Sequence, residues 1–420
     1  MSAVSAERPG LPGWLYVVFL AALATATDEF IIAGVLPAVA GDLGVGVAAA
    51  GQLVTAFAVA YAVGAPTLAV VCERFPRRTV MAVALAVFVL ANVAAAVAPG
   101  YYALLAARVV AALGAAVVTS AAFATAAAGA PEGEQGRYLG VVTAGMTAAL
   151  FTGVPVGSWL GGAMGWRATF WLIAAVGTAA LVGVLTTAPT VPGAAPAPWR
   201  ERLAPLRNAG VLRLVAVTFL AAGGGLMFYT YLGAYTAQVV PRPGGLLSFL
   251  LFVVGLAGLA GALLAGRATD VWGPARSLRL VVGGHALALG PAAVLVFTGV
   301  ESPLVLAAVV GCWAVFAWGL TPPVQGGILA AAGPSRGMTA LALNICGLYL
   351  GTGVAGAAGG AVINAVGARY LPLAAMLLMG LSFAVSCFSP GRAPVPGALR
   401  LTASPEPPGC PTAPAGGRER

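Results

Sequence analysis

"PTVPGAAPAPWRERLAPLRNAGVL", residues 189–212, is a long polar interruption in a chain made mostly of apolar runs. The stretch is rich in proline and alanine and carries charge, which is typical of a linker. Six apolar runs precede it and six follow it. The sequence therefore predicts two halves, residues 13–188 and 213–390. We expect residues 1–12 to form a short N-terminal segment, and residues 391–420, rich in Pro, Gly and Ser, to form a disordered tail.

Composition indicates a membrane protein. Of the 420 residues, 60% are hydrophobic and 8% are charged, and the mean hydropathy is +0.97. Soluble proteins carry about 25% charged residues. The net charge of +9 does not indicate a nucleic-acid partner, because the arginines fall at the ends of apolar segments, as topology rules require. We expect the lipid bilayer as the partner and no nucleic acid.

The apolar runs predict an all-α integral membrane protein with twelve transmembrane helices, since about 20 apolar residues cross the hydrocarbon core. Two runs, 102–128 and 303–330, are long enough to tilt or kink. The predicted helices are 13–36, 48–71, 79–98, 102–128, 138–160, 168–188, 213–237, 246–266, 278–298, 303–330, 338–363 and 370–389.

The arginines predict the orientation. With both termini in the cytoplasm, 17 arginines fall in cytoplasmic segments and three in outer loops, and Arg108 lies inside a helix. This is a strong positive-inside bias. We expect a multi-pass protein of the cell membrane with both ends cytoplasmic.

The two halves resemble each other. ERFPRR (73–78) and RATDVWGPAR (267–276) end corresponding helices, and GVPVGSWLGG (153–162) corresponds to GVAGAAGG (353–360). Each pair is offset by roughly 200 residues, and duplicated six-helix halves are typical of one large transporter architecture. We therefore expect two pseudo-symmetric six-helix bundles.

Four local patterns carry a resemblance to the major facilitator superfamily, and within it to the 12-helix drug:proton antiporters. AVVCERFPRR (69–78) resembles the family pattern G-x-x-x-D-R-x-G-R-R, departing at Ala69, Glu73 and Pro76, and GRATDVWGPAR (266–276) is a closer copy. In the family this loop helps to gate the cytoplasmic side. The resemblance implies that role for Glu73, Arg74, Arg77, Arg78, Gly266, Asp270, Gly273 and Arg276.

The other three patterns lie in the first half. LAARVVAALGAA (105–116) resembles the family's fourth helix, whose arginine, here Arg108, has a role in proton coupling. TDEFIIAGVLPAVAGDLGV (27–45) resembles its first helix. GVPVGSWLGG resembles the Gly- and Pro-rich antiporter motif of helix 5, with Val154 where the family has Gly. Small-residue packing is the alternative interpretation of that motif. The motif residues are Gly153, Pro155, Gly157, Gly161 and Gly162.

Asp28 and Glu29 are two acids in an apolar run, and Arg108 is the natural partner for them. On the predicted helix bounds all three lie at similar depth in the outer half of the membrane. Intramembrane charges normally pair and face a bundle interior or an aqueous cavity. Adjacent helix positions are about 100° apart, so the two acids cannot both point at one spot. We interpret the three as a proton-coupling site, the alternative being a lock between helices 1 and 4. Which acid carries the proton stays open, and family placement favours Glu29.

Aromatic and polar side chains in the apolar helices are candidates for a substrate cavity, which would suit lipophilic, weakly polar ligands. Packing between helices is the alternative for each of them, and the single histidine, His285, is left unassigned. The candidates are Asn92, Phe228, Tyr231, Tyr235, Trp313, Phe316, Gln325 and Asn344.

These patterns together predict a secondary transporter, not an enzyme, that exports a small lipophilic compound, a drug or antibiotic, in exchange for protons by alternating access. An exporter of sugars, nucleosides or other metabolites is the alternative, and a membrane enzyme or receptor is disfavoured. The cysteines show no metal-ligand spacing and the chain lacks a G-x-x-x-x-G-K-[ST] loop. We expect no metal or cofactor, and a monomer whose partners are a small-molecule substrate, protons and lipid.

Overall fold

A computed structural model of the chain describes residues 11–131, 134–193, 198–241, 245–333 and 336–388. Within these ranges all regular structure is helical, and they belong to one compact unit that ends at Phe388. The predicted disordered tail, 391–420, and most of the predicted N-terminal segment lie outside the described residues.

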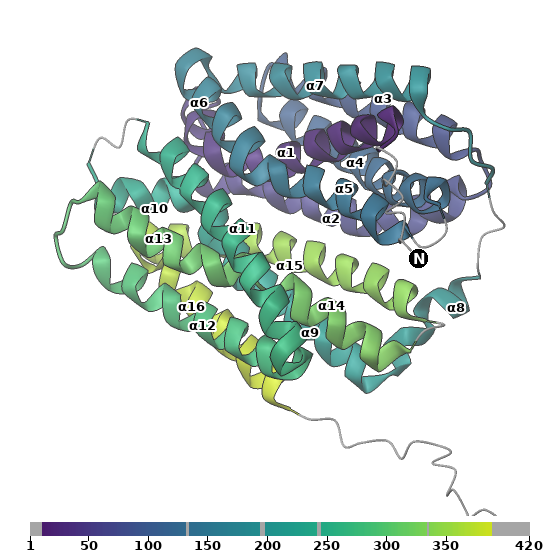
Figure 1. Ribbon diagram of the computed structural model, residues 1–420. Helices are drawn as coiled ribbons and strands as arrows, with labels where there is room; N and C mark the ends of the chain where they lie inside the picture. Colours follow the sequence, from purple (N-terminus) through teal and green to yellow (C-terminus); the bar gives the residue numbers. More distant parts are fainter. Residues whose placement is uncertain (1–10, 132–133, 194–197, 242–244, 334–335, 389–420) are drawn as a thin grey trace, which may run out of the picture. The chain divides into compact units, whose positions relative to one another are not determined.

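The helices before the linker form one group, called here the N-bundle (Figure 1). Its elements are α1 (Gly13–Asp42), α2 (Val47–Cys72), α3 (Arg77–Ala96), α4 (Tyr101–Gly129), α5 (Gln135–Ala148), the π-helix η1 (Ala149–Gly153), α6 (Val154–Met164) and α7 (Trp166–Thr187).

The helices after the linker form the second group, the C-bundle. Its elements are α9 (Ala209–Thr230), α10 (Leu232–Val239), α11 (Leu246–Trp272), α12 (Pro274–Leu295), α13 (Pro303–Trp318), α14 (Thr321–Ala332), α15 (Gly337–Val366), the 3₁₀ turn η3 (Ala368–Tyr370) and α16 (Leu371–Cys387). Across the described residues, 12 helices are long and apolar enough to cross a membrane, which confirms the predicted all-α fold class.

Three of the spans are interrupted. The fifth span, called here helix 5, consists of α5, η1 and α6. In it, η1 precedes Pro155, which has no amide hydrogen to continue the α-helical bonding pattern. Helix 10 divides into α13 and α14 just before Pro322 and Pro323, within the run predicted to tilt or kink. Helix 7 divides into α9 and α10 at Tyr231.

Several predicted boundaries differ from the structure by a few residues, including the end of α11, predicted at residue 266 and found at Trp272. The predicted end of the first helix, residue 36, is wrong, because α1 continues through Pro37 to Asp42. Residues 189–212 are not wholly irregular, since they contain α8 (Trp199–Leu203), the 3₁₀ turn η2 (Ala204–Arg207) and the start of α9. Helix α9 begins early because the Asn208 side chain caps it, accepting hydrogen bonds from the amides of Gly210 and Val211.

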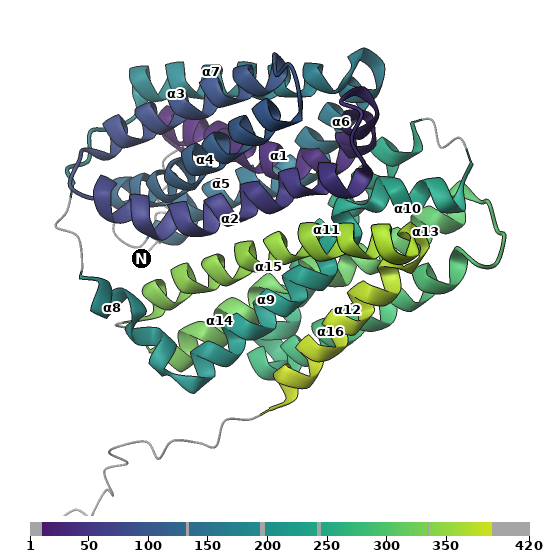
Figure 2. The same cartoon turned by 180° about the vertical axis from the view of Figure 1, so that it is seen from behind.

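The two bundles meet along α2 and α15, which lie side by side in Figure 2. Glycines of α15 allow close approach: a Cβ on Gly353 would lie 3.1 Å from Val59, and one on Gly356 would lie 2.5 Å from Thr55 Oγ1. The Thr55 hydroxyl donates to the Gly353 carbonyl at 3.1 Å. This packing lies toward the predicted outer ends of both helices. GVAGAAGG thus serves as contact surface between the bundles.

Candidate functional site

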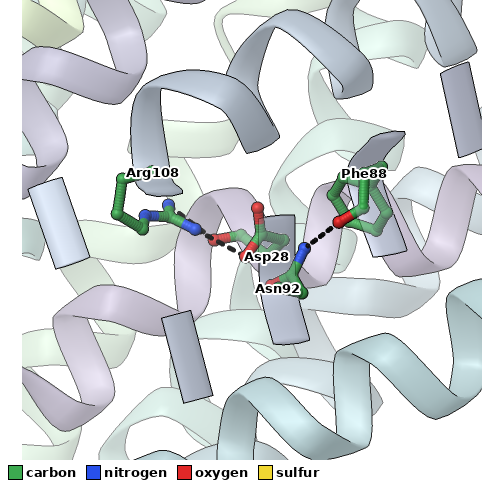
Figure 3. A network of polar contacts seen from close by, with 4 residues as sticks. All are labelled: Asp28, Phe88, Asn92 and Arg108. Carbon is green, nitrogen blue, oxygen red and sulfur yellow. Dashed lines mark hydrogen bonds and ion pairs between the residues drawn. The ribbon is translucent and has the colours of Figure 1, made fainter. Parts of the chain in front are cut away.

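Asp28 and Arg108 form a buried ion pair between α1 and α4 (Figure 3). Arg108 Nη1 lies 2.5 Å from Asp28 Oδ1, and Arg108 Nη2 donates to the Asp28 carbonyl oxygen at 3.0 Å. Both residues are 0% exposed. Buried charges are tolerated when they pair in this way. Because both helices belong to the N-bundle, this pair holds together one bundle.

The surroundings of the pair are aromatic and incompletely bonded. The guanidinium carbon of Arg108 lies 4.3 Å from the ring centre of Phe57 and 5.9 Å from that of Phe170. Among the described atoms, Asp28 Oδ2 and Arg108 Nε have no hydrogen-bond partner. The site therefore retains one free carboxylate oxygen that can accept a proton or a further donor.

Glu29 points to a different place. Its Oε2 accepts a hydrogen bond of 2.7 Å from the hydroxyl of Tyr349, which belongs to α15 of the C-bundle. The two neighbouring acids thus face different partners, as the 100° between adjacent helix positions requires. Asp28 faces its own bundle, and Glu29 faces the interface between the bundles.

Glu29 also lines a small cavity between the bundles, with a volume of about 20 Å³. Thr230, beside the break in helix 7, and Thr352 line it as well, together with Tyr229. A space of this size holds about one water molecule when polar groups surround it. A larger cavity, of about 200 Å³, lies among α1, helix 5 and α7, and its lining has no charged side chain. Of these two cavities, the smaller one is lined by an ionisable side chain, that of Glu29.

Most of the predicted cavity candidates lie in packed surroundings. The rings of Phe228 and Trp313 are 5.0 Å apart, and those of Phe228 and Tyr235 are 5.1 Å apart, with all three residues fully buried. The Tyr235 hydroxyl donates to the Ala292 carbonyl, and the Tyr231 hydroxyl to that of Gly356. In this conformation the three interlocked rings form part of the core of the C-bundle.

The remaining candidates are dispersed. Asn92 is buried in α3, where its amide donates to the Phe88 carbonyl at 3.0 Å (Figure 3). Phe316 lies against the backbone of Gly284, and Gln325 is exposed on α14. The buried Asn344 Oδ1 has no partner among the described atoms. The structure does not gather these residues around Glu29, and their role in substrate binding stays a prediction.

The helix 5 motif packs on α1. Gly153, Gly157 and Gly161 lie against Thr27, Ile31 and Val35 respectively, a four-residue step on both helices. A Cβ on Gly157 would lie 2.8 Å from Ile31 Cδ1, and one on Gly161 would lie 2.6 Å from Val35 Cγ1. Small residues at this spacing bring helices into close contact. Gly162, by contrast, has nothing within 4 Å of a Cβ position.

The two predicted gating loops differ in their partners. Glu73 forms an ion pair of 2.5 Å with Arg202 of the linker helix α8, and Arg78 donates to the Leu185 carbonyl. Asp270 and Arg276, in the second copy, are exposed, and no ion pair of either is present in the described part of the chain. The first loop is thus attached to the linker in this conformation.

In the second loop, Gly273 has φ +79°, a conformation that favours glycine. It ends α11 and precedes α12. Arg74 lies in the first loop, and Arg77, which begins α3, donates its amide hydrogen to the Val191 carbonyl at 2.9 Å. Gly266 lies inside α11, before the second loop. Their gating role stays a prediction.

Sequence reasoning missed Tyr349 and Tyr61, which lie with Glu29 at the bundle interface. Tyrosines in membrane helices are enriched near the two membrane surfaces. Tyr349 lies near the middle of α15 and Tyr61 near the middle of α2, far from the ends of either helix. A mid-helix tyrosine is a signal that would have selected both residues.

The hydrogen bond between Trp313 and His285 in the C-bundle leads to a stability prediction. Trp313 Nε1 donates to His285 Nε2 at 2.9 Å, and both residues are buried. Trp313→Phe removes the donor and leaves a buried acceptor unpaired, so we expect a loss of about 1–3 kcal/mol in the free energy of unfolding. Denaturant titration of the purified protein measures it. Trp171→Phe, on a half-exposed side chain, is the control, with an expected change within about 0.5 kcal/mol. Equal losses in both variants would contradict the prediction.

Two six-helix groups, with an ion pair buried in one and an acid facing the other, define a multi-pass membrane protein of transporter type. A family model described as Major Facilitator Superfamily matches residues 18–336. The MFS-type transporter YbcL of Bacillus subtilis is 35% identical over 352 residues, which cover 84% of this chain and 89% of that protein. The chain therefore belongs to the major facilitator superfamily.

Two further comparisons agree with this assignment. A chloramphenicol resistance protein of Streptomyces lividans is 37% identical over 310 residues, covering 70% of this chain and 78% of that protein. The crystal structure of a bacterial homologue of the human lysosomal transporter Spinster, inward-facing and unoccupied, matches with a TM-score of 0.67. It is 17% identical and covers 89% of this chain and 95% of that one, so this likeness concerns the fold.

Proposed function

We propose that this transporter exports small lipophilic compounds across the plasma membrane in exchange for protons, with both termini in the cytoplasm. The observation that carries the proposal is the position of Glu29: an ionisable side chain in the N-bundle, bonded across the interface to the C-bundle and lining a cavity there. An acid at a moving interface can bind or release a proton as its surroundings change, which links protons to the alternation between conformations.

The side chains near this acid support the proposed substrate class. Phe30, Tyr229 and Trp318 form a run of ring contacts, with centroids 5.9 Å and 5.6 Å apart. Aromatic walls with a few polar groups suit lipophilic ligands. The similarity to a chloramphenicol resistance protein supports an antibiotic as one such ligand.

The contacts between the bundles support a conformation that opens to the cytoplasm. Ser158 and Ser248 hydroxyls lie 3.0 Å apart, and the glycines of α15 pack on α2, all in the predicted outer half. The orientation itself rests on the 17 arginines predicted on the cytoplasmic side. In this state a substrate would enter from the cytoplasm.

Transport in everted membrane vesicles tests the proposal. With an imposed proton gradient, the unaltered protein should accumulate labelled chloramphenicol, and excess sugar should not compete. Glu29→Gln keeps the shape but cannot ionise, so we expect gradient-driven accumulation to fall at least tenfold while downhill exchange persists.

Glu301→Gln provides the matched control, because Glu301 is exposed between α12 and α13. It should accumulate substrate at the unaltered rate. Full proton-driven accumulation by Glu29→Gln would contradict the coupling role of this acid, and competition by sugar alone would favour a metabolite exporter.

A further inference from the structure

Tyr349 connects the two bundles close to Asp28 and Glu29. It belongs to α15, yet its hydroxyl donates to Glu29 of α1 at 2.7 Å, and only 4% of the residue is exposed. A hydroxyl that donates to a carboxylate favours the charged form of the acid. Since donor and acceptor belong to different bundles, the bond depends on how the bundles lie.

A second aromatic ring fixes the position of the first. Tyr61 of α2 stacks on Tyr349 with centroids 3.7 Å apart and planes 15° apart. Tyr61 also stacks on Phe57 at 6.3 Å, and Phe57 contacts the Arg108 guanidinium. A continuous series of contacts therefore runs from Glu29 through Tyr349 to Arg108 and the Asp28 ion pair.

Other ionisable groups face Glu29 from the helices around α1. Asp28 precedes it on α1, and Arg108 lies on α4. Tyr61 faces it from α2 and Tyr229 from α9, and Cys346 lies with Tyr349 on α15. Of these groups, the Tyr349 hydroxyl is the one with a hydrogen bond to the Glu29 carboxylate in the described structure.

We propose that Tyr349 is a positioning residue for proton exchange. Its hydroxyl stabilises the charged form of Glu29 while the two bundles are in contact on the outer side, and this hydrogen bond breaks when the bundles separate there. This inference rests on the proposed function, because it assigns the regulation of the same acid. Opening on the outer side would remove the donor, and Glu29 would then take up a proton from outside. Closing would restore the donor and favour release of that proton inward.

The variant Tyr349→Phe tests this step, because it removes the hydroxyl and keeps the ring that stacks on Tyr61. Spin labels at Val97→Cys and Val300→Cys, on exposed outer loops of the two bundles, report the distance between the bundles as pH changes. The charged form of Glu29 loses a donor in Tyr349→Phe. The pH midpoint of the distance change should therefore move upward by about one unit, equivalent to a tenfold change in proton affinity.

Two further variants separate the role of the hydroxyl from a loss of packing. Tyr16→Phe, a matched loss of a hydroxyl on an exposed side chain near the start of α1, should keep the midpoint of the unaltered protein. Adding Tyr349→Phe to Glu29→Gln should change nothing further, since the acceptor is already neutral. An unaltered midpoint in Tyr349→Phe, or a distance that does not respond to pH in the unaltered protein, would overturn the inference. The vesicle assay decides the proposed function separately, because it measures transport and not bundle distance.

Discussion

Arg108→Ala is expected to lower the free energy of unfolding by about 3–5 kcal/mol and to abolish proton-driven accumulation of substrate. The substitution leaves Asp28 fully buried without its partner, and an uncompensated buried charge is strongly destabilising. It also removes the contact with the Phe57 ring. Denaturant titration measures the stability change, and the vesicle assay measures transport.

The control is a double variant, Asp28→Asn with Arg108→Gln. Replacing both members of a buried ion pair with neutral groups is often far less costly than removing one. The double variant should therefore recover most of the stability while proton-driven transport stays absent. If Arg108→Ala alone unfolds at the same denaturant concentration as the unaltered protein, the ion pair does not stabilise the N-bundle.

Gly356→Val is expected to reduce transport at least tenfold by preventing closure of the outer side. A Cβ at this position would lie 2.5 Å from Thr55 Oγ1 and 2.9 Å from the Gly51 carbonyl oxygen. The backbone of α2 cannot move aside as a side chain does, and overpacking of this kind costs about 1–3 kcal/mol. Because the contact lies between bundles, separation of the bundles relieves it without unfolding either. The 97–300 spin-label distance should lengthen.

Gly380→Val on α16 is the matched control for this experiment, since nothing lies within 4 Å of its Cβ position. It should leave both the distance and the transport rate unchanged. A Gly356→Val protein with the short distance of the unaltered protein would show that α2 and α15 tolerate the added volume.

The twelve spans were predictable because each depends on a run of apolar residues, which the bilayer requires and the sequence displays directly. The end of α1 was not: the predicted helix stops at residue 36, whereas α1 continues through Pro37 to Asp42. The interruption of helix 7 at Tyr231 could not be predicted either, because no proline lies there. Boundaries of this kind depend on tertiary packing and not on local composition.

The Asp28–Arg108 pair could be predicted from the sequence, because two acids in apolar helices have a single arginine available there as an ion-pair partner. The Tyr349–Glu29 bond was not, because the two residues are 320 positions apart and nothing local specifies which helix of one bundle faces which of the other. The aromatic candidates of the C-bundle were selected by spacing on one face. Spacing alone does not distinguish a cavity wall from a packed core.

The packing of the helix 5 glycines on α1 affects how motion passes between the two helices. Asp28 and Glu29 lie on the same helix against which Gly153, Gly157 and Gly161 are seated. Because small residues bring these two helices into close contact, we expect a displacement of α1 at the acids to carry helix 5 with it. We expect the helix 5 motif to contribute rigidity to transport without contacting substrate or proton.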